Sequence, residues 1–82
     1  MKYDDKLREQ IKDLTLMLLY LNSFDDYGYR SWKGYDFNDL NALAEEGLIS
    51  EGRRTKSVVL YDEGIEKARA LCAEYGICLP KE

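Results

Sequence analysis

The fold is decided by residues 36–64, DFNDLNALAEEGLISEGRRTKSVVLYDEG. Its first part has apolar residues at spacings of three and four, which predicts a helix over about residues 37–46. Asp36 stands just before this helix, where its carboxylate can accept a hydrogen bond from a free backbone amide of the first turn. One face of the predicted helix is apolar and is expected to be buried: Phe37, Leu40, Leu43 and Ala44.

Gly47 is expected to end this helix, because glycine adopts the left-handed conformation without a side-chain clash. Leu48 would then fold back on Leu43. The stretch that follows predicts a hairpin, with strands at 48–50 and 57–61 joined by a polar, basic tip.

A third helix is predicted from about Glu63 to Tyr75, with Gly76 as its end. Its expected inner face is formed by Ile65, Ala68, Leu71, Cys72 and Tyr75.

The central stretch resembles the "L..L...GLI....RR.KS..LT.EG" run of winged-helix regulators of the MarR and PadR type. In these families the helix before the GLI enters the DNA major groove, and the hairpin is the wing. The family's capping threonine is Tyr61 here, which cannot cap, and Asp62 is the nearest residue able to take over one position later. The matching residues are Leu40, Leu43, Glu46, Gly47, Leu48, Ile49, Arg53, Arg54, Lys56, Ser57, Leu60, Glu63 and Gly64.

The first helix is predicted over residues 4–22, with an apolar residue at every third or fourth position. We call this stripe the apolar seam: Leu7, Ile11, Leu14, Leu18 and Leu21. The last two turns are apolar nearly all round, so they require cover on every side. Either the helix is the central core helix of a monomer, or Leu7, Ile11 and Leu18 belong to a dimer contact.

Between the first two helices lies an aromatic segment, with seven aromatic residues from Tyr20 to Phe37. A winged helix places its positioning helix here, but no helical period is visible and two glycines interrupt the segment. We therefore expect the positioning helix to be absent or cut to a turn, and residues 29–32 could add a short edge strand to the hairpin. The large rings either cover the core, or Trp32, Lys33 and Tyr35 form a recognition surface for a protein or a nucleobase.

The hairpin tip carries three basic residues, Arg53, Arg54 and Lys56, which are candidates for contacts with DNA phosphates. In the alternative interpretation the two arginines neutralise nearby glutamates, Glu45, Glu46 and Glu51. The outward face of the preceding helix is acidic and lacks positive charge, which is evidence against insertion into the major groove. The candidate DNA-reading face consists of Asn38, Asp39, Asn41, Glu45 and Glu46.

Composition disfavours catalysis and metal binding. The chain has no histidine and only two cysteines, Cys72 and Cys78, which we expect to be reduced thiols with Cys72 in the core. With 12 basic and 16 acidic residues, the net charge is −4, the wrong sign for a protein that relies on many phosphate contacts. The N-terminus carries no signal-peptide pattern, and no apolar run is long enough to cross a membrane.

The sequence therefore predicts one winged-helix-like α+β domain over residues 1–82, with three helices and a two- or three-stranded β-hairpin wing. We expect a non-enzymatic cytoplasmic homodimer without a cofactor or metal, acting as a regulator or adaptor through protein contacts. Candidate partner contacts are Leu7, Ile11, Leu18, Trp32 and Tyr35. The alternative is a DNA-binding transcriptional regulator that contacts phosphates through Arg53, Arg54 and Lys56.

Overall fold

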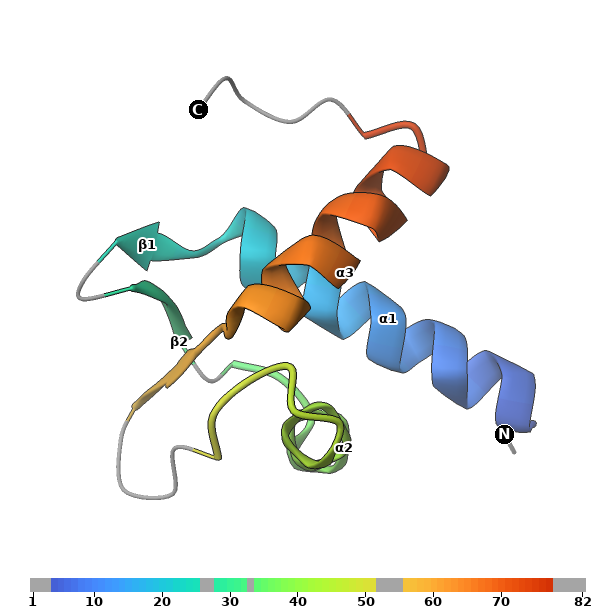
Figure 1. The fold of residues 1–82 in the computed structure, drawn as a ribbon. Coiled ribbons are helices and arrows are strands. Elements are labelled where there is room, and N and C mark those ends of the chain that lie inside the picture. The colour runs from blue at the N-terminus through green and yellow to red at the C-terminus, as the bar shows by residue number, and fades with distance from the viewer. Residues whose placement is uncertain (1–3, 26–27, 33, 52–55, 78–82) are drawn as a thin grey trace.

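The computed structural model contains three helices and a three-stranded antiparallel sheet (Figure 1). It describes residues 4–25, 28–32, 34–51 and 56–77. The α+β prediction of three helices with a small antiparallel sheet is confirmed. In chain order the elements are α1 (Asp5–Leu21), β1 (Phe24–Asp25), β2 (Tyr29–Trp32), α2 (Phe37–Glu45), β3 (Ser57–Val59) and α3 (Asp62–Glu74).

The first two helices begin at acidic caps, of which Asp36 was predicted. The Asp4 carboxylate accepts a hydrogen bond from the Leu7 amide at 2.7 Å, and the Asp36 carboxylate accepts one from the Asn38 amide at 2.8 Å. Each bond satisfies a backbone donor that the helix itself leaves free. The helix predicted over residues 4–22 corresponds to α1 with the two residues that flank it, Asp4 and Asn22.

Gly47 ends α2 as predicted, with a φ of 76°. The Leu48 amide donates to the Leu43 carbonyl at 3.1 Å, and the Gly47 amide donates to the Ala44 carbonyl at 3.0 Å. This pair of bonds is the Schellman arrangement, in which a left-handed residue lets the chain turn back and satisfy the last carbonyls. The same arrangement ends α3 at Gly76, where φ is 72°.

The start of α3 differs from the prediction. The helix begins at Asp62 rather than Glu63, and the capping position is held by Tyr61, whose side chain makes no capping hydrogen bond. The expectation that Asp62 would act as the cap is therefore wrong. Asp62 and Glu63 lie instead in the first turn, where their negative charges favour the helix dipole.

The aromatic segment supplies two of the three strands, and the order across the sheet is β1-β2-β3. The strand predicted at residues 29–32 is β2. It lies at the centre of the sheet rather than at an edge, because β1 pairs with its other side. The predicted strand at 48–50 is reduced to a single bridge between Ile49 and Leu60. None of the described residues between Asn22 and Asp36 is helical, as the absence of a helical period in this segment predicts.

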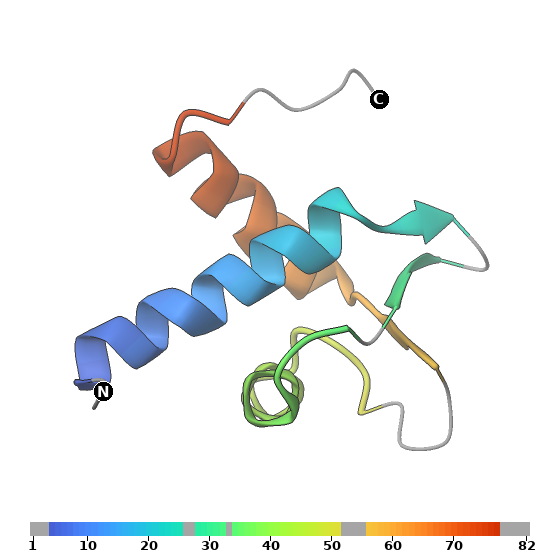
Figure 2. The same ribbon diagram turned by 180° about the vertical axis from the view of Figure 1, so that it is seen from behind.

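The core lies where α1 crosses α3, with α2 beside the crossing and the sheet at the C-terminal end of α1 (Figures 1 and 2). Phe37 was predicted to be buried but is 72% exposed, because it is the first residue of α2 and the buried face of that helix begins one turn later, at Leu40. Tyr75, at the end of α3, is also exposed rather than buried. The central apolar residues are Leu16, Leu19, Leu40, Leu43, Leu48, Ile49, Val58, Leu60 and Ala68.

Candidate interaction surfaces

An open depression of about 460 Å³ lies where the C-terminal end of α1 meets the end of β2. Both aromatic residues that the sequence marks for recognition, Trp32 and Tyr35, line it. We call this depression the aromatic site. Its lining residues are Asn22, Ser31, Trp32, Gly34 and Tyr35.

Strand alternation sets the exposure of Trp32. Successive side chains of a strand point to opposite faces, so the inward position of Ser31, which is 1% exposed, places Trp32 on the outer face. The Trp32 side chain is 62% exposed. Its ring packs on Phe24 of β1, with the ring centres 5.1 Å apart and the planes tilted by 37°. The indole is therefore braced on one side and open to solvent on the rest of its surface.

Tyr35 takes a different position. Its ring is half-buried and packs against the core, and its hydroxyl accepts a hydrogen bond from the Asn22 side-chain amide at 3.1 Å. Tyr20 and Tyr35 thus help to cover the core, whereas the Trp32 ring is largely exposed; Lys33 lies outside the described residues.

The apolar seam of α1 is a second uncovered surface. Leu14, Leu18 and Leu21 are 42%, 46% and 39% exposed, and Leu7 and Ile11 are half-buried. The same helix buries Leu16 and Leu19 completely in the core. The last two turns of α1 were expected to be covered on every side, but the domain covers one side of them and leaves Leu18 and Leu21 exposed.

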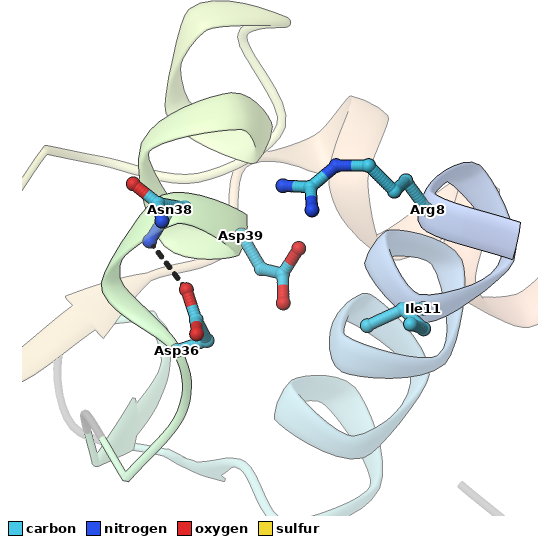
Figure 3. A pocket seen from close by; sticks show the side chains of 5 residues that line it. All are labelled: Arg8, Ile11, Asp36, Asn38 and Asp39. Atoms are coloured by element: carbon cyan, nitrogen blue, oxygen red, sulfur yellow. Dashed lines mark hydrogen bonds between the residues drawn. The ribbon is translucent and has the colours of Figure 1, made fainter. Parts of the chain in front are cut away.

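Beside the seam, a cleft of about 200 Å³ separates α1 from the beginning of α2. Figure 3 shows Arg8 and Asp39 extending into it from the two helices, with Ile11 on the α1 wall. The Asp36 carboxylate already occupies the positive end of α2 by capping the Asn38 amide. Because two carboxylates line this cleft, it is unfavourable for a phosphate group.

A cluster of charged side chains, absent from the sequence predictions, joins α1, the end of α2 and α3. Lys12 is 8% exposed and forms ion pairs with Glu9 at 2.9 Å and with Glu46. Glu46 is also 3.5 Å from the Lys67 ammonium. One signal in the sequence could have indicated this cluster: Lys12 falls on the same helix face as Leu16 and Leu19, where a lone charge requires a partner.

The cluster changes the acidity of its members. Burial acts to lower the pKa of Lys12, but the hydrogen bonds and charges of Glu46 and Glu9 outweigh it, and the pKa is raised. The hydrogen bond from Lys12 lowers the pKa of Glu46. Burial raises the pKa of Asp13, whose Oδ1 atom is buried without a hydrogen-bond partner and lies 3.9 Å from Lys67. In this cluster the Glu9 and Glu46 carboxylates are therefore paired with Lys12, whereas the Asp13 carboxylate is poorly satisfied.

Among the basic residues of the hairpin tip, the structure describes Lys56, which is exposed just before β3. Arg53 and Arg54, with their predicted pairing to glutamates, lie outside the described residues. The Glu46 carboxylate is bound by Lys12 and Lys67.

Cys72 is fully buried, as predicted for a core thiol, and burial raises its pKa. Cys78 lies outside the described residues. Within the described ranges, no group of three or more Cys, Asp, Glu or His side chains is arranged to hold a metal ion. The described helices include none with the length and apolar character needed to span a membrane.

The model of a protein family, the domain of unknown function DUF6429, matches residues 7–77, from the first residue of the apolar seam to just beyond α3. The chain belongs to this family. Its curated relatives include an uncharacterized protein, y4hR, of Sinorhizobium fredii (strain NBRC 101917 / NGR234). The two chains are 36% identical over 64 residues, which cover 77% of this chain and 84% of the relative. No solved structure matches the chain.

Proposed function

We propose that this member of the DUF6429 family is a small non-enzymatic regulatory or adaptor protein that acts through protein contacts in the cytoplasm. The exposure of Trp32 carries the proposal. Tryptophan is enriched among the residues that dominate binding energy at protein interfaces, because one side chain supplies a large contact area. An exposed indole braced by Phe24 loses little freedom on binding.

The surroundings of Trp32 support a protein ligand. The depression beside it offers a polar floor at Ser31 and an amide at Asn22, so apolar and hydrogen-bonding groups lie next to each other. Interfaces combine such apolar anchors with a few polar contacts. The net charge of −4 disfavours a phosphate-rich partner.

The resemblance to MarR and PadR regulators favours a second candidate function, a transcriptional regulator that holds DNA through Arg53, Arg54 and Lys56. The exposed position of Lys56 is compatible with it. The outward face of α2 weighs against it, since Asn38, Asn41 and Glu45 are exposed there without a basic residue among them, and Asp39 lies on the same helix. Carboxylates at these positions would repel the phosphate backbone.

Affinity capture with tagged protein tests the first candidate. We expect wild-type protein to retain a protein from a cell extract of its source, and Trp32→Ala to lose it. Phe37→Ala is the matched control, because Phe37 is also an exposed aromatic residue and lies outside the aromatic site. If both variants retain the same proteins as the wild type, the aromatic site is not a partner surface.

A gel shift with random duplex DNA at two salt concentrations tests the second candidate. If the protein works through protein contacts, the double variant Arg53→Ala/Arg54→Ala should retain as little DNA as the wild type. Tight binding that weakens with salt and is lost in the double variant would establish the DNA-binding function instead.

A further inference from the structure

We infer that the apolar seam of α1 binds the same seam of a second copy of this chain, with the two helices antiparallel. The inference deepens the proposed protein-contact role by naming one partner. The seam meets the aromatic site only at Asn22, and separate variants, Leu18→Glu and Trp32→Ala, test the two proposals.

The geometry of α1 supplies the first step. Consecutive residues are rotated by about 100° around a helix, so Leu14 and Leu18 lie about 160° from Leu16, which is buried in the core. The seam is therefore on the opposite side of α1 from its own domain. Three leucines of the seam remain exposed. The five seam residues together follow the 4-3-4-3 spacing with which one helix packs against another.

The width of the seam identifies a helix as the occupant. Only two of every seven positions belong to it, which is the narrow stripe of a two-helix coiled coil and not the broader face that packs on a sheet. Thr15 and Met17, which flank the seam between Leu14 and Leu18, are already buried within the domain.

The uncharged residues beside the seam favour a second copy as that helix. Coiled-coil partners are selected by charged residues beside the seam, and like charges there oppose self-association. From residue 10 onward the flanking residues are uncharged, so the seam carries no charge code for a different partner and nothing that repels its own copy. These residues are Gln10, Thr15, Met17 and Asn22.

The helix dipoles favour one direction. The N-terminal end of α1 carries Lys6 and Arg8 beside Asp4 and Asp5, so its charges do not distinguish a parallel from an antiparallel pair. A parallel pair would align the two helix dipoles side by side, which is unfavourable. An antiparallel pair opposes the dipoles.

The antiparallel arrangement predicts specific layers across the two-fold axis. Leu14 packs on Leu18 of the partner subunit, and Ile11 packs on Leu21 of the partner subunit. The contact is a single helix pair, so we expect a dimer with a Kd of roughly 1–100 µM.

Sedimentation equilibrium across a dilution series tests the association. Wild-type protein should shift from monomer to dimer, and Leu18→Glu should raise the Kd by at least about 100-fold, because each seam would bury a carboxylate. Phe37→Glu is the matched control: it adds the same charge at an exposed apolar residue outside the seam and should dimerise like the wild type. A wild type that stays monomeric at all concentrations, or a Leu18→Glu protein that dimerises normally, overturns the inference.

Disulfide trapping tests the direction, in a Cys78→Ser background that retains the buried Cys72. Ile11→Cys and Leu21→Cys proteins are mixed and oxidised. In the antiparallel pair the two cysteines face each other and form a mixed disulfide, whereas identical cysteines are about 15 Å apart and cannot join. In a parallel pair only identical cysteines meet. Mixed cross-links support the inference, and homodimeric cross-links overturn it. Retention of the Trp32-dependent partner by Leu18→Glu would show that the aromatic site acts independently of the dimer.

Discussion

The backbone of Gly64, in the first turn of α3, lies directly against the carbonyl group of Leu48. A Cβ atom at Gly64 would overlap the Leu48 carbonyl oxygen and lie 3.0 Å from its carbonyl carbon. The same oxygen accepts a hydrogen bond from the Tyr61 amide at 3.0 Å, so it is held in place. Gly64 thus permits α3 to start immediately beside the chain that leaves α2.

Gly64→Ala should therefore destabilise the protein by about 1–3 kcal/mol, the usual cost of forcing an extra carbon into a packed site. Urea denaturation followed by circular dichroism measures the change. Gly34→Ala is the control, because an added Cβ there meets no atom within 4 Å, and it should alter stability by less than about 0.5 kcal/mol. Equal effects at the two positions would refute the close approach as the cause.

Tyr61→Thr should stabilise the protein by about 0.5–1 kcal/mol. Tyr61 holds the capping position of α3 in an extended conformation but contributes no side-chain hydrogen bond, and a threonine hydroxyl can accept one from a free amide of the first turn. Thermal unfolding reports the gain. Tyr75→Thr at the other end of α3 should give no such increase, since a hydroxyl acceptor has no free amide there. A Tyr61→Thr protein less stable than the wild type would show that the exposed tyrosine ring contributes more than a cap.

Asp13→Asn should make the protein more stable at neutral pH. Burial raises the pKa of Asp13 above its ordinary value of 3.8, so ionisation of this group opposes folding. The gain in stability of the variant over the wild type is largest above the raised pKa. It disappears as the pH falls below about 4, where the Asp13 carboxyl is protonated in both the folded and the unfolded protein. Urea denaturation between pH 3 and pH 7 follows this difference.

Glu46→Gln is the matched control within the same cluster and should have the opposite effect. The hydrogen bond from Lys12 lowers the pKa of Glu46, so its stabilising contribution is present at neutral pH and is lost as the pH falls through that lowered value. The variant should be less stable than the wild type at pH 7 and equal to it in acid. The same pH dependence for both variants would contradict the assigned pKa directions.

Trp32→Ala should lower the free energy of unfolding by only about 0.5–1.5 kcal/mol, because most of the indole is already in water. The loss corresponds to the ring contact with Phe24. Leu43→Ala, at a fully buried position, should cost about 2–5 kcal/mol. Trp32 is the single tryptophan of the chain, so acrylamide quenching of the wild type reports its exposure directly. Weak quenching in the folded protein would contradict the exposed position.

Local signals predicted the helix ends well. Asp36 and Gly47 act within one turn of their own positions, and the structure places both in their expected roles. The start of α3 was misjudged by one residue because Tyr61 occupies the capping position with a suitable backbone but an unsuitable side chain. Sequence reasoning identified the missing cap and placed its replacement wrongly.

Contacts between distant segments explain what the sequence did not reveal. The central place of β2 depends on its pairing with β3, a segment on the far side of α2. The exposure of Phe37 depends on where the core ends, which helical spacing alone does not define. One of the two ion-pair partners of Lys12, Glu46, comes from the end of another helix. For the candidate surfaces, spacing located the apolar seam, but strand alternation was needed to separate the exposed Trp32 from the half-buried Tyr35.

The pairing of β2 with β3 also governs the order of assembly. The chain between these two strands contains all of α2, so closing the sheet encloses that helix in a loop. The β1–β2 pair joins neighbouring segments and incurs a small entropic cost, whereas the β2–β3 pair must close a long loop before any of its hydrogen bonds form. We therefore expect closure of the β2–β3 loop to limit the rate of folding, and that rate to respond more to residues of α2 and β3 than to residues of β1.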